Sequence, residues 1–514
     1  MLQPELPVRC FRPVGGLEES LSEFRRFYIR TYGCQMNAHD SEKVANLLYH
    51  AGWVAARDSD EADLLVINTC SIRDKAEHQL YSDLGLLRKW KAARPGRVLG
   101  VAGCVAQQAG DAIQRRFGHV DFVFGTHNLR LVPSMVAAAL QGNPSLEVGE
   151  SASLERFDLP ERHPDYRGTS PGRGYLTVME GCDMFCSFCV VPGTRGREIS
   201  RPADGIVAEA RSLAARGVRE LTLLGQTVNA YGRHDRRRDQ AGTVSFGALL
   251  RRLAEIPGIE RLRYTSPHPL FFDDDLIAAH AELDVLCPHV HLPLQSGSNP
   301  ILERMRRRYS VDDYRARVAA LRAARPDLVL TTDLIVAFPG ETDEDFRGTL
   351  DLVSEVGFVD AYSFKYSPRP GTTAASMPGA VPGDVAQTRL EELQELQRGL
   401  TLAAHRRRVG DSTEVLVTGH SRHGGSQLSG RDPYHRVVNF SAASGVVEPG
   451  ELVPVRIVDA TPHSLIGEVA DAESAGRMRR SVKSESGMAD EEGRSALFQA
   501  VPVRQPSGAS PHGD

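Results

Sequence analysis

The sequence contains no run of eighteen apolar residues, so no segment is expected to span a membrane. The N-terminus lacks a basic region followed by an apolar segment, and no secretory signal is expected. Cysteine is scarce: eight among 514 residues are too few for a disulfide scaffold, and their spacing fits a metalloprotein of a reducing cytoplasm. Basic residues are not in excess, because the formal net charge is -5. Nucleic-acid binding would therefore depend on a local basic face.

Three of the cysteines, Cys182, Cys186 and Cys189, lie within eight residues of one another. Thiolates this close can converge on one soft metal centre. An iron–sulfur cluster of the 4Fe-4S type usually takes four thiolates, so three would leave one iron open to a substrate. A structural zinc site needs four closed ligands, and no further cysteine or histidine follows closely enough. Three unrelated buried cysteines remain as the other alternative.

A second set of cysteines, Cys34, Cys70 and Cys104, is spread over the N-terminal part of the chain. Each directly follows an expected strand, at about 27–32, 63–68 and 97–102. Because the carboxyl ends of parallel strands share one edge of a sheet, these remote cysteines should meet in space. Three buried cysteines at strand ends are the alternative. Cys10, in the N-terminal extension, and Cys287, before a strand, are assigned no role.

The hydrophobic pattern predicts an α/β protein with three folded domains. A βα alternation after residue 25 predicts a parallel sheet covered by helices on both faces. Six strand candidates further on predict a partial (β/α)6 barrel with its active residues at the carboxyl ends of the strands. Short alternating strands near the C-terminus predict a small OB-like β-barrel. The expected divisions are a flexible extension at 1–24, the N-terminal domain at 25–141, a linker at 142–167, the central barrel at 168–400, the small β-barrel at 401–471 and a disordered tail at 472–514.

The residues around the closely spaced cysteines resemble the radical S-adenosylmethionine (SAM) enzymes. The resemblance is carried by the cysteine spacing, by Phe188 just before the last cysteine, and by the words at 180–182, 191–198, 200–202, 224–232 and 291–298. It is strongest to the methylthiotransferase family, in the branch that acts on tRNA, and covers about residues 25–470. It implies a radical SAM barrel in the centre, a TRAM RNA-binding domain at the C-terminus, and two 4Fe-4S clusters, one on each set of cysteines. SAM would be chelated by the open iron of the Cys182 cluster.

The resemblance also implies further binding residues, and no catalytic residue beyond the clusters. Contacts to SAM are expected at the carboxyl edge of the barrel, from Phe188, Gln226, Gln295, Ser296, Phe338 and Gly340. Capping or turn roles are the alternative for any single polar residue of this set. Contacts to RNA phosphates are expected from Arg406, Arg407, Arg408, Arg431 and Arg436, with Arg422 on the same side. A solvated charged face is the alternative for these arginines.

The activity implied by the resemblance is methylthiolation of C2 of N6-isopentenyl (dimethylallyl) adenosine at position 37 of tRNA. It would use two SAM per product, one as methyl donor and one as radical source, with sulfur held at the N-terminal cluster. The expected partners are tRNA bearing isopentenyl-adenosine and an electron donor such as flavodoxin or ferredoxin, and the protein is expected to be a cytoplasmic monomer with no membrane partner. Three alternatives stay open: methylthiolation of threonylcarbamoyl-adenosine in tRNA, methylthiolation of a ribosomal protein side chain, and a non-catalytic iron–sulfur RNA-binding protein.

Overall fold

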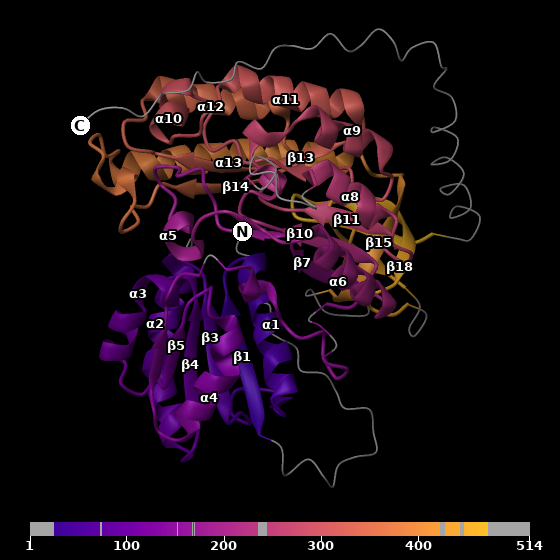
Figure 1. The fold of residues 1–514 in the computed structure, drawn as a ribbon. Coiled ribbons are helices and arrows are strands. Elements are labelled where there is room, and N and C mark those ends of the chain that lie inside the picture. Colours follow the sequence, from indigo (N-terminus) through magenta and orange to yellow (C-terminus); the bar gives the residue numbers. More distant parts are fainter. Residues whose placement is uncertain are drawn as a thin grey trace.

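The computed structural model describes residues 25–71, 74–151, 153–166, 168, 170–234, 244–421, 427–442 and 447–470. Three units follow one another along the chain: an N-terminal parallel sheet domain, a central barrel and a C-terminal β-barrel (Figure 1). The flexible extension, Cys10, Arg422 and the C-terminal tail of the sequence analysis lie outside the described residues. The expected fold class, with its three domains in this order, is confirmed.

The N-terminal domain is a six-stranded parallel sheet in the order β2-β1-β3-β4-β5-β6. Its central strands β3 and β4 are buried along their whole length, as the continuous apolar runs predict for a sheet covered on both faces. Two separate apolar clusters, one on each face, pack the helices onto the sheet. The elements are β1 (Arg26–Tyr32), α1 (Gln35–His50), β2 (Val54–Ala55), β3 (Leu64–Thr69), α2 (Asp74–Ala92), β4 (Val98–Gly103), α3 (Cys104–Arg116), β5 (Phe122–Phe124), α4 (Val132–Leu140) and β6 (Ser145–Glu147).

The central domain holds the six parallel strands that the sequence predicts. They form two three-stranded sheets, β7-β10-β11 and β12-β13-β14, and a parallel bridge between Leu262 and Leu286 carries the first sheet toward the second. The strands are β7 (Arg173–Thr177), β10 (Glu220–Leu224), β11 (Arg261–Tyr264), β12 (His289–His291), β13 (Val329–Val336) and β14 (Asp360–Lys365). The helices around them are α6 (Ala203–Ala215), α8 (Phe246–Ala254), α9 (Asp274–Glu282), α10 (Asn299–Arg304), α11 (Val311–Ala324), α12 (Asp343–Val356) and α13 (Gly383–Arg406).

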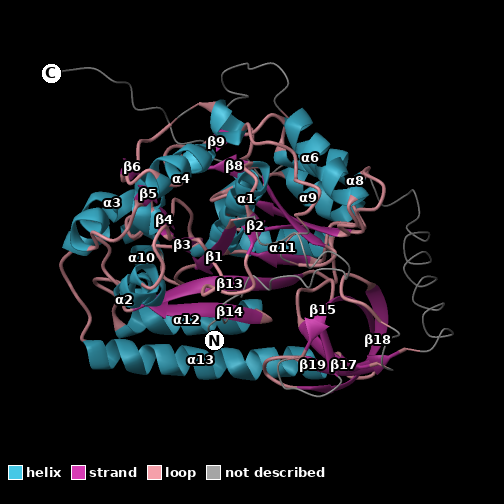
Figure 2. Ribbon diagram, turned by 90° about the horizontal axis from the view of Figure 1, so that it is seen from below, coloured by secondary structure: helices cyan, strands magenta, loops and turns pink. Residues whose placement is uncertain are grey.

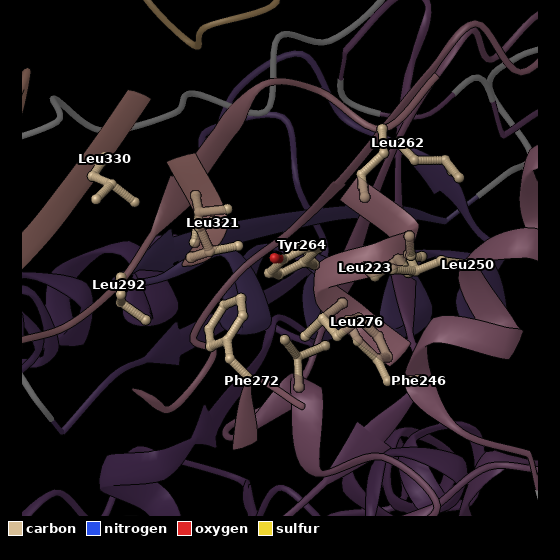
Figure 3. Packing of buried hydrophobic residues seen from close by; sticks show 14 of the residues in the cluster. Leu223, Phe246, Leu250, Leu262, Tyr264, Phe272, Leu276, Leu292, Leu321 and Leu330 are labelled. Atoms are coloured by element: carbon tan, nitrogen blue, oxygen red, sulfur yellow. The ribbon is translucent and has the colours of Figure 1, made fainter. Parts of the chain in front are cut away.

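The main core of the central domain lies between its strands and their outer helices. Figure 3 shows Leu223 and Leu262, from adjacent strands, packed with Phe246 and Leu250 of α8 and with Leu276 of α9. Because side chains alternate across a strand, the neighbours of these leucines point to the inside of the barrel. This inner face carries the charged residues Glu220, Arg261 and Arg263, so the two faces of the sheet differ strongly in polarity.

The C-terminal unit is a closed five-stranded barrel in the order β15-β16-β17-β19-β18. Its strands are β15 (Ser412–His420), β16 (Gln427–Arg431), β17 (Val437–Ser441), β18 (Leu452–Ala460) and β19 (Leu465–Val469). Figure 2 shows α13 running beside β14 and ending at this barrel. The β-barrel is seated on the amino ends of the central strands. Arg261 and Arg263 donate to the backbone oxygens of Glu414 and Asp432 at 2.6 and 2.8 Å.

One part of the fold differs from the sequence-based expectation. Strand β6 lies in the expected linker at 142–167, yet it pairs with β5 as the edge of the N-terminal sheet. Three residues of strand give too short an alternation to be recognised, so part of the expected linker belongs to the folded domain. None of the described helices is both long and apolar enough to cross a membrane.

Candidate functional site

The N-terminal cysteines lie at the carboxyl ends of three adjacent strands. Cys34 follows β1 and precedes α1, Cys70 directly follows β3, and Cys104 is the first residue of α3 after β4. Strands β1, β3 and β4 are neighbours in register, with Tyr32 beside Thr69 and Thr69 beside Gly103. The structure therefore brings the three cysteines to one edge of the sheet, as the βα spacing predicts.

Two glycines allow the strand ends to approach each other closely. Gly33 has φ +133°, and a Cβ placed there would lie 2.2 Å from the Cβ of Cys70. Gly103 has φ +93°, and its Cβ would lie 2.3 Å from the side-chain oxygen of Asn68. Any other residue at either position would push two cysteine-bearing loops apart. The glycines thus set the spacing of the three thiols.

The electrostatic setting of this edge favours thiolates at Cys34. A hydrogen bond with the Cys70 thiol and the charge of Arg195 together lower the pKa of Cys34 to about 6, although burial opposes them. Burial raises the pKa of Cys104, and Arg195 partly opposes that rise. Cys34 and Cys104 also stand at helix N-termini, where the helix dipole favours negative charge.

The second set of cysteines occupies the loop that follows β7 and the short strand β8 (Met179–Glu180). Each thiol accepts at least one hydrogen bond. Thr227 contacts Cys182 Sγ at 3.0 Å, Arg307 Nη1 donates to Cys186 Sγ at 3.4 Å, and the Val191 amide donates to Cys189 Sγ at 3.5 Å. Burial raises the pKa of Cys182 and raises that of Cys189 to about 12. A positive charge is thus needed nearby to hold these sulfurs as thiolates.

Both sets of residues fit an anionic cluster with three protein ligands. Around the Cys182 set, the buried Arg307 guanidinium and backbone N–H groups supply donors to sulfur, and hydrogen bonds of this kind tune iron–sulfur sites. No group of three His, Cys, Asp or Glu side chains in the described residues is arranged to hold a single metal ion. Thiolate sulfurs with N–H and cationic donors around them are the kind of ligand that an iron–sulfur cluster takes.

Three of the residues expected to contact SAM lie close to the cysteine loop. Gln226 Oε1 accepts from the Gly181 amide at 2.5 Å, and its Nε2 is buried without a hydrogen-bond partner among the described residues. The rings of Phe188 and Phe338 meet edge to face with their centroids 6.4 Å apart. Phe338 is completely buried, and Phe188 is partly buried against the same small apolar cluster.

The other three expected SAM residues lie at the ends of β12 and β13. Gln295 has φ +72° and pairs through its backbone with β13. The Ser296 hydroxyl is fully buried and contacts Thr349 Oγ1 at 3.5 Å, so it supports the fold locally. Gly340 has φ +85°, and its amide donates to the Gly379 oxygen at 2.7 Å. A role in SAM binding stays a prediction for all six residues.

The arginines expected to contact RNA are placed differently from one another. Arg406 and Arg407, at the end of α13, are exposed. Arg408 is half-buried and pairs with Asp411 at 3.1 Å. RNA binding stays a prediction for this run, in which Arg406 and Arg407 are the members open to a phosphate backbone.

Arg431 and Arg436 point inward, toward the other domains of the chain. Arg431 Nη1 donates to the His435 oxygen at 2.6 Å, and Arg436 is buried beside Asp432, with 3.5 Å between Nη1 and Oδ2. The guanidinium of Arg436 also lies over the ring of Tyr434. These contacts hold the loop between β16 and β17, and neither side chain presents its charge to solvent as Arg406 and Arg407 do.

Sequence reasoning missed a group of buried charges between the N-terminal domain and the central barrel. Glu180, just before the cysteine loop, lies 3.6 Å from Lys43 and 3.5 Å from Arg156. Arg195, at the end of α5 (Val191–Arg195), pairs with Asp40 of α1 at 2.6 Å. Figure 1 shows α5 at the junction of the two domains. Glu180 and Arg195 stand in the words that carry the resemblance, which was the available signal.

Three families match successive parts of the chain. Residues 26–125 match the family described as Uncharacterized protein family UPF0004, residues 176–353 match the Radical SAM superfamily, and residues 406–470 match the TRAM domain. The fold and the loop with three cysteines thus define a radical SAM protein with a C-terminal TRAM domain.

Curated relatives narrow the class. The chain is 49% identical over 443 residues to a protein of Geobacter metallireducens, covering 86% of this chain and 98% of the relative. It is 46% identical over 449 residues to one of Cereibacter sphaeroides, covering 87% and 99%. Both relatives are named tRNA-2-methylthio-N(6)-dimethylallyladenosine synthase. This chain belongs to the family of the tRNA-2-methylthio-N(6)-dimethylallyladenosine synthases, which confirms the expected resemblance.

Solved structures support the fold. The radical SAM methyltransferase TsrM of Kitasatospora setae, with a tryptophan substrate and a SAM analogue bound, superposes with a TM-score of 0.52 at 15% identity, covering 68% of this chain and 75% of that one. A second structure of TsrM, with cobalamin and a [4Fe-4S] cluster bound, gives a TM-score of 0.50 at 14% identity, covering 86% and 84%.

Proposed function

We propose that this protein methylthiolates C2 of N6-isopentenyladenosine at position 37 of tRNA. Its relatives, matched over nearly their whole length, bear the name of that activity. The observation that carries the proposal is the presence of two three-thiol sites in one chain. They are linked by α5, which begins two residues after Cys189 and ends at Arg195 beside Cys34 and Cys104.

The two sites divide the work. Cys182, Cys186 and Cys189 would hold one 4Fe-4S cluster, which when bound supplies the electron that cleaves SAM reductively. Arg307, which is buried and donates to Cys186 Sγ, would balance the negative charge of that site. The Thr227 hydroxyl and the Val191 amide fix the orientation of Cys182 and Cys189.

Cys34, Cys70 and Cys104 would hold the second 4Fe-4S cluster and, at its open position, the sulfur to be inserted. The close approach enforced by Gly33 keeps Cys34 and Cys70 on one centre. Arg195 reaches this edge from the cysteine loop of the barrel, so the two sites are held in a fixed relation. Sulfur and radical would therefore be delivered to the same substrate carbon.

The overall reaction replaces the C2–H bond of the adenine with a C2–S–CH3 group. One SAM loses its methyl group to the sulfur and leaves as S-adenosylhomocysteine. The other is split by one electron into methionine and a 5′-deoxyadenosyl radical, which takes the hydrogen atom of C2 and leaves as 5′-deoxyadenosine. Joining the C2 radical to the methylated sulfur releases one electron, which the cluster held by Cys34, Cys70 and Cys104 would take up when bound, as the bond from that sulfur to the cluster is broken. A radical is required because no side chain is basic enough to remove a proton from this aromatic carbon.

The same proposal names the partners. An external one-electron donor, such as flavodoxin or ferredoxin, would reduce the radical SAM site in the cytoplasm, where tRNA is modified. The substrate tRNA would bind with its loop base splayed into the barrel, and the exposed Arg406 and Arg407 would contact its phosphates. A single chain already contains both thiol sites and the TRAM domain, and we propose that the protein acts as a monomer.

Mass spectrometry of tRNA nucleosides from cells with and without the protein tests the proposal. We expect the 2-methylthio-isopentenyl-adenosine signal to vanish in the deletion strain and to return with the wild-type chain. Persistence of that nucleoside would refute the substrate assignment. Loss of a methylthio-threonylcarbamoyl nucleoside would point to the other tRNA substrate, and loss of a modified ribosomal protein side chain to the third. If SAM, dithionite and RNA yield no 5′-deoxyadenosine, the protein is a non-catalytic RNA-binding protein.

A further inference from the structure

Arg195 is a buried cation that links the radical SAM loop to the N-terminal cysteines. It ends α5, six residues after Cys189, and only 3% of it is exposed. Its Nη2 donates to Oδ2 of Asp40 at 2.6 Å, and Asp40 lies on α1, the helix that begins after Cys34. The charge of its guanidinium also lowers the pKa of the thiols of Cys34 and Cys104. One side chain of the central domain thus reaches the thiol edge of the other domain.

The segment that carries Arg195 is fixed on both sides. The Thr126 hydroxyl donates to the Thr194 oxygen at 2.6 Å, across the domain junction. Gly196 follows with φ +73°, and a Cβ there would lie 2.9 Å from the ring of His127. Because the backbone is held before and after Arg195, the direction of its side chain is set by the fold.

The hydrogen-bonding capacity of the Arg195–Asp40 pair is only half used. Among the described residues, Arg195 Nη1 and Asp40 Oδ1 have no hydrogen-bond partner. Burying charges is expensive unless their remaining donors and acceptors are satisfied. An unused guanidinium donor whose charge acts on the Cys34 and Cys104 thiols therefore points to an anionic acceptor that the protein alone does not supply.

We propose that Arg195 is a positioning residue for the N-terminal iron–sulfur cluster, to whose sulfur atoms its free Nη1 donates and whose reduced form its charge stabilises. This inference rests on the proposed function for the existence of that cluster. It assigns to Arg195 a role that the cysteine pattern does not contain. Asp40 has the opposite part: it orients the guanidinium and offsets its charge.

The two charges have opposite effects on the reduction potential of the cluster. Hydrogen bonds to cluster sulfurs and nearby positive charge raise the potential of an iron–sulfur centre. Arg195→Gln removes both and leaves the Asp40 carboxylate, so the potential should become more negative. Asp40→Asn removes a negative charge and keeps the cation, so the potential should become less negative. If Arg195 only held the two domains together, the two substitutions would not be expected to shift the reduction potential in opposite directions.

The test uses the full chain with Cys182→Ala, Cys186→Ala and Cys189→Ala, so that only the N-terminal cluster forms. Anaerobic reconstitution is followed by iron and sulfide analysis, and the midpoint potential is measured by redox titration followed by electron paramagnetic resonance. The variants Arg195→Gln, Arg195→Lys and Asp40→Asn are compared with this parent. We expect a negative shift for Arg195→Gln, a smaller one for Arg195→Lys and a positive shift for Asp40→Asn.

Arg263→Gln is the matched control. Arg263 is equally buried and lies 3.1 Å from Glu220, but it stands at the amino end of the barrel strands, against the TRAM domain. Its loss should leave the potential unchanged.

An unchanged potential in both Arg195→Gln and Asp40→Asn, with the cluster intact, overturns this proposal and leaves the proposed function standing. Shifts of the same sign in both variants also overturn it. If Arg195→Gln binds no iron, Asp40→Asn decides by its sign alone. A parent that binds no iron at all overturns the proposal together with the N-terminal cluster.

Discussion

Replacing Gly33 with alanine tests the N-terminal site most directly. The new Cβ would stand 2.2 Å from the Cβ of Cys70, whereas ordinary contacts begin at 3.4 Å. One of the two loops must therefore move by about 1.2 Å, the difference between those distances. The conformation at φ +133° adds strain of about 1–3 kcal/mol for a residue with a side chain. A shift of this size is enough to separate Cys34 from Cys70 as ligands of one centre.

The matched control is Gly52→Ala in the same domain. Gly52 has φ +82°, so alanine is strained there too, but nothing lies within 4 Å of its Cβ. The two variants thus share a backbone cost and differ in the clash at the thiol edge. After anaerobic reconstitution, iron and sulfide are measured together with the yield of 5′-deoxyadenosine.

We expect Gly33→Ala to lose about half of the bound iron while it still forms 5′-deoxyadenosine, because the Cys182 site is untouched. Gly52→Ala should keep the full iron content. Full iron in Gly33→Ala would refute the inference that close approach of the strand ends builds the site. Equal losses in both variants would show that strain in the domain, and not the clash with Cys70, causes the effect.

Four further outcomes are expected. The triple variant Cys182→Ala, Cys186→Ala, Cys189→Ala should keep about half of the iron and form no 5′-deoxyadenosine; loss of all iron would contradict independent sites. Cys34→Ala should form 5′-deoxyadenosine but no methylthio product, and any methylthiolated nucleoside from it would contradict the assigned role. Burial raises the pKa of Glu220, but the charges of Arg263, Arg173 and Arg261 outweigh burial and lower the pKa to about 2. The ionised Glu220 therefore stabilises the fold above its ordinary pKa of 4.5, and this stabilisation is lost as the pH falls toward 2. Glu220→Gln should thus cost about 3–5 kcal/mol in neutral denaturant unfolding, against about 0–1 kcal/mol for the exposed Glu282→Gln, and equal costs would contradict a buried network. Arg406→Ala with Arg407→Ala should weaken tRNA binding and flatten its salt dependence by about 0.7–0.9 per lost phosphate contact, whereas Arg315→Ala on α11 should not, and a matching change in Arg315→Ala would argue for a nonspecific effect of net charge.

The sequence predicts the features that depend on local periodicity and on chain order. The six central strands stand where alternation and apolar runs place them, and the closed β-barrel follows them as expected. Convergence of Cys34, Cys70 and Cys104 could be predicted because parallel strands share their carboxyl edge. That argument uses topology alone and needs no knowledge of side-chain packing.

What the sequence does not reveal depends on contacts between distant segments. The pairing of Arg195 with Asp40 joins residues 155 positions apart, and no local pattern shows that the two meet, although Arg195 lies in a stretch that carries the resemblance. Arg431 and Arg436 are predicted to form a basic surface, but both side chains are engaged by contacts of the β16–β17 loop, and Arg436 is buried. Strand β6 is too short for an alternation, and only its neighbour β5 defines it.

Because the β-barrel packs on the amino ends of the central strands, the central domain separates the β-barrel from the cysteine loop. The β-barrel contacts the first residues of β11 and β12, whereas the cysteine loop follows the last residue of β8, at the opposite ends of the strands. The longest strand of the central domain, β13, has eight residues and spans about 26 Å at about 3.3 Å per residue. An RNA held at both places would have to bridge a length of this order. A full anticodon arm would then reach both contacts. A fragment that carries only the loop would reach the catalytic site but would lack the contact at the β-barrel.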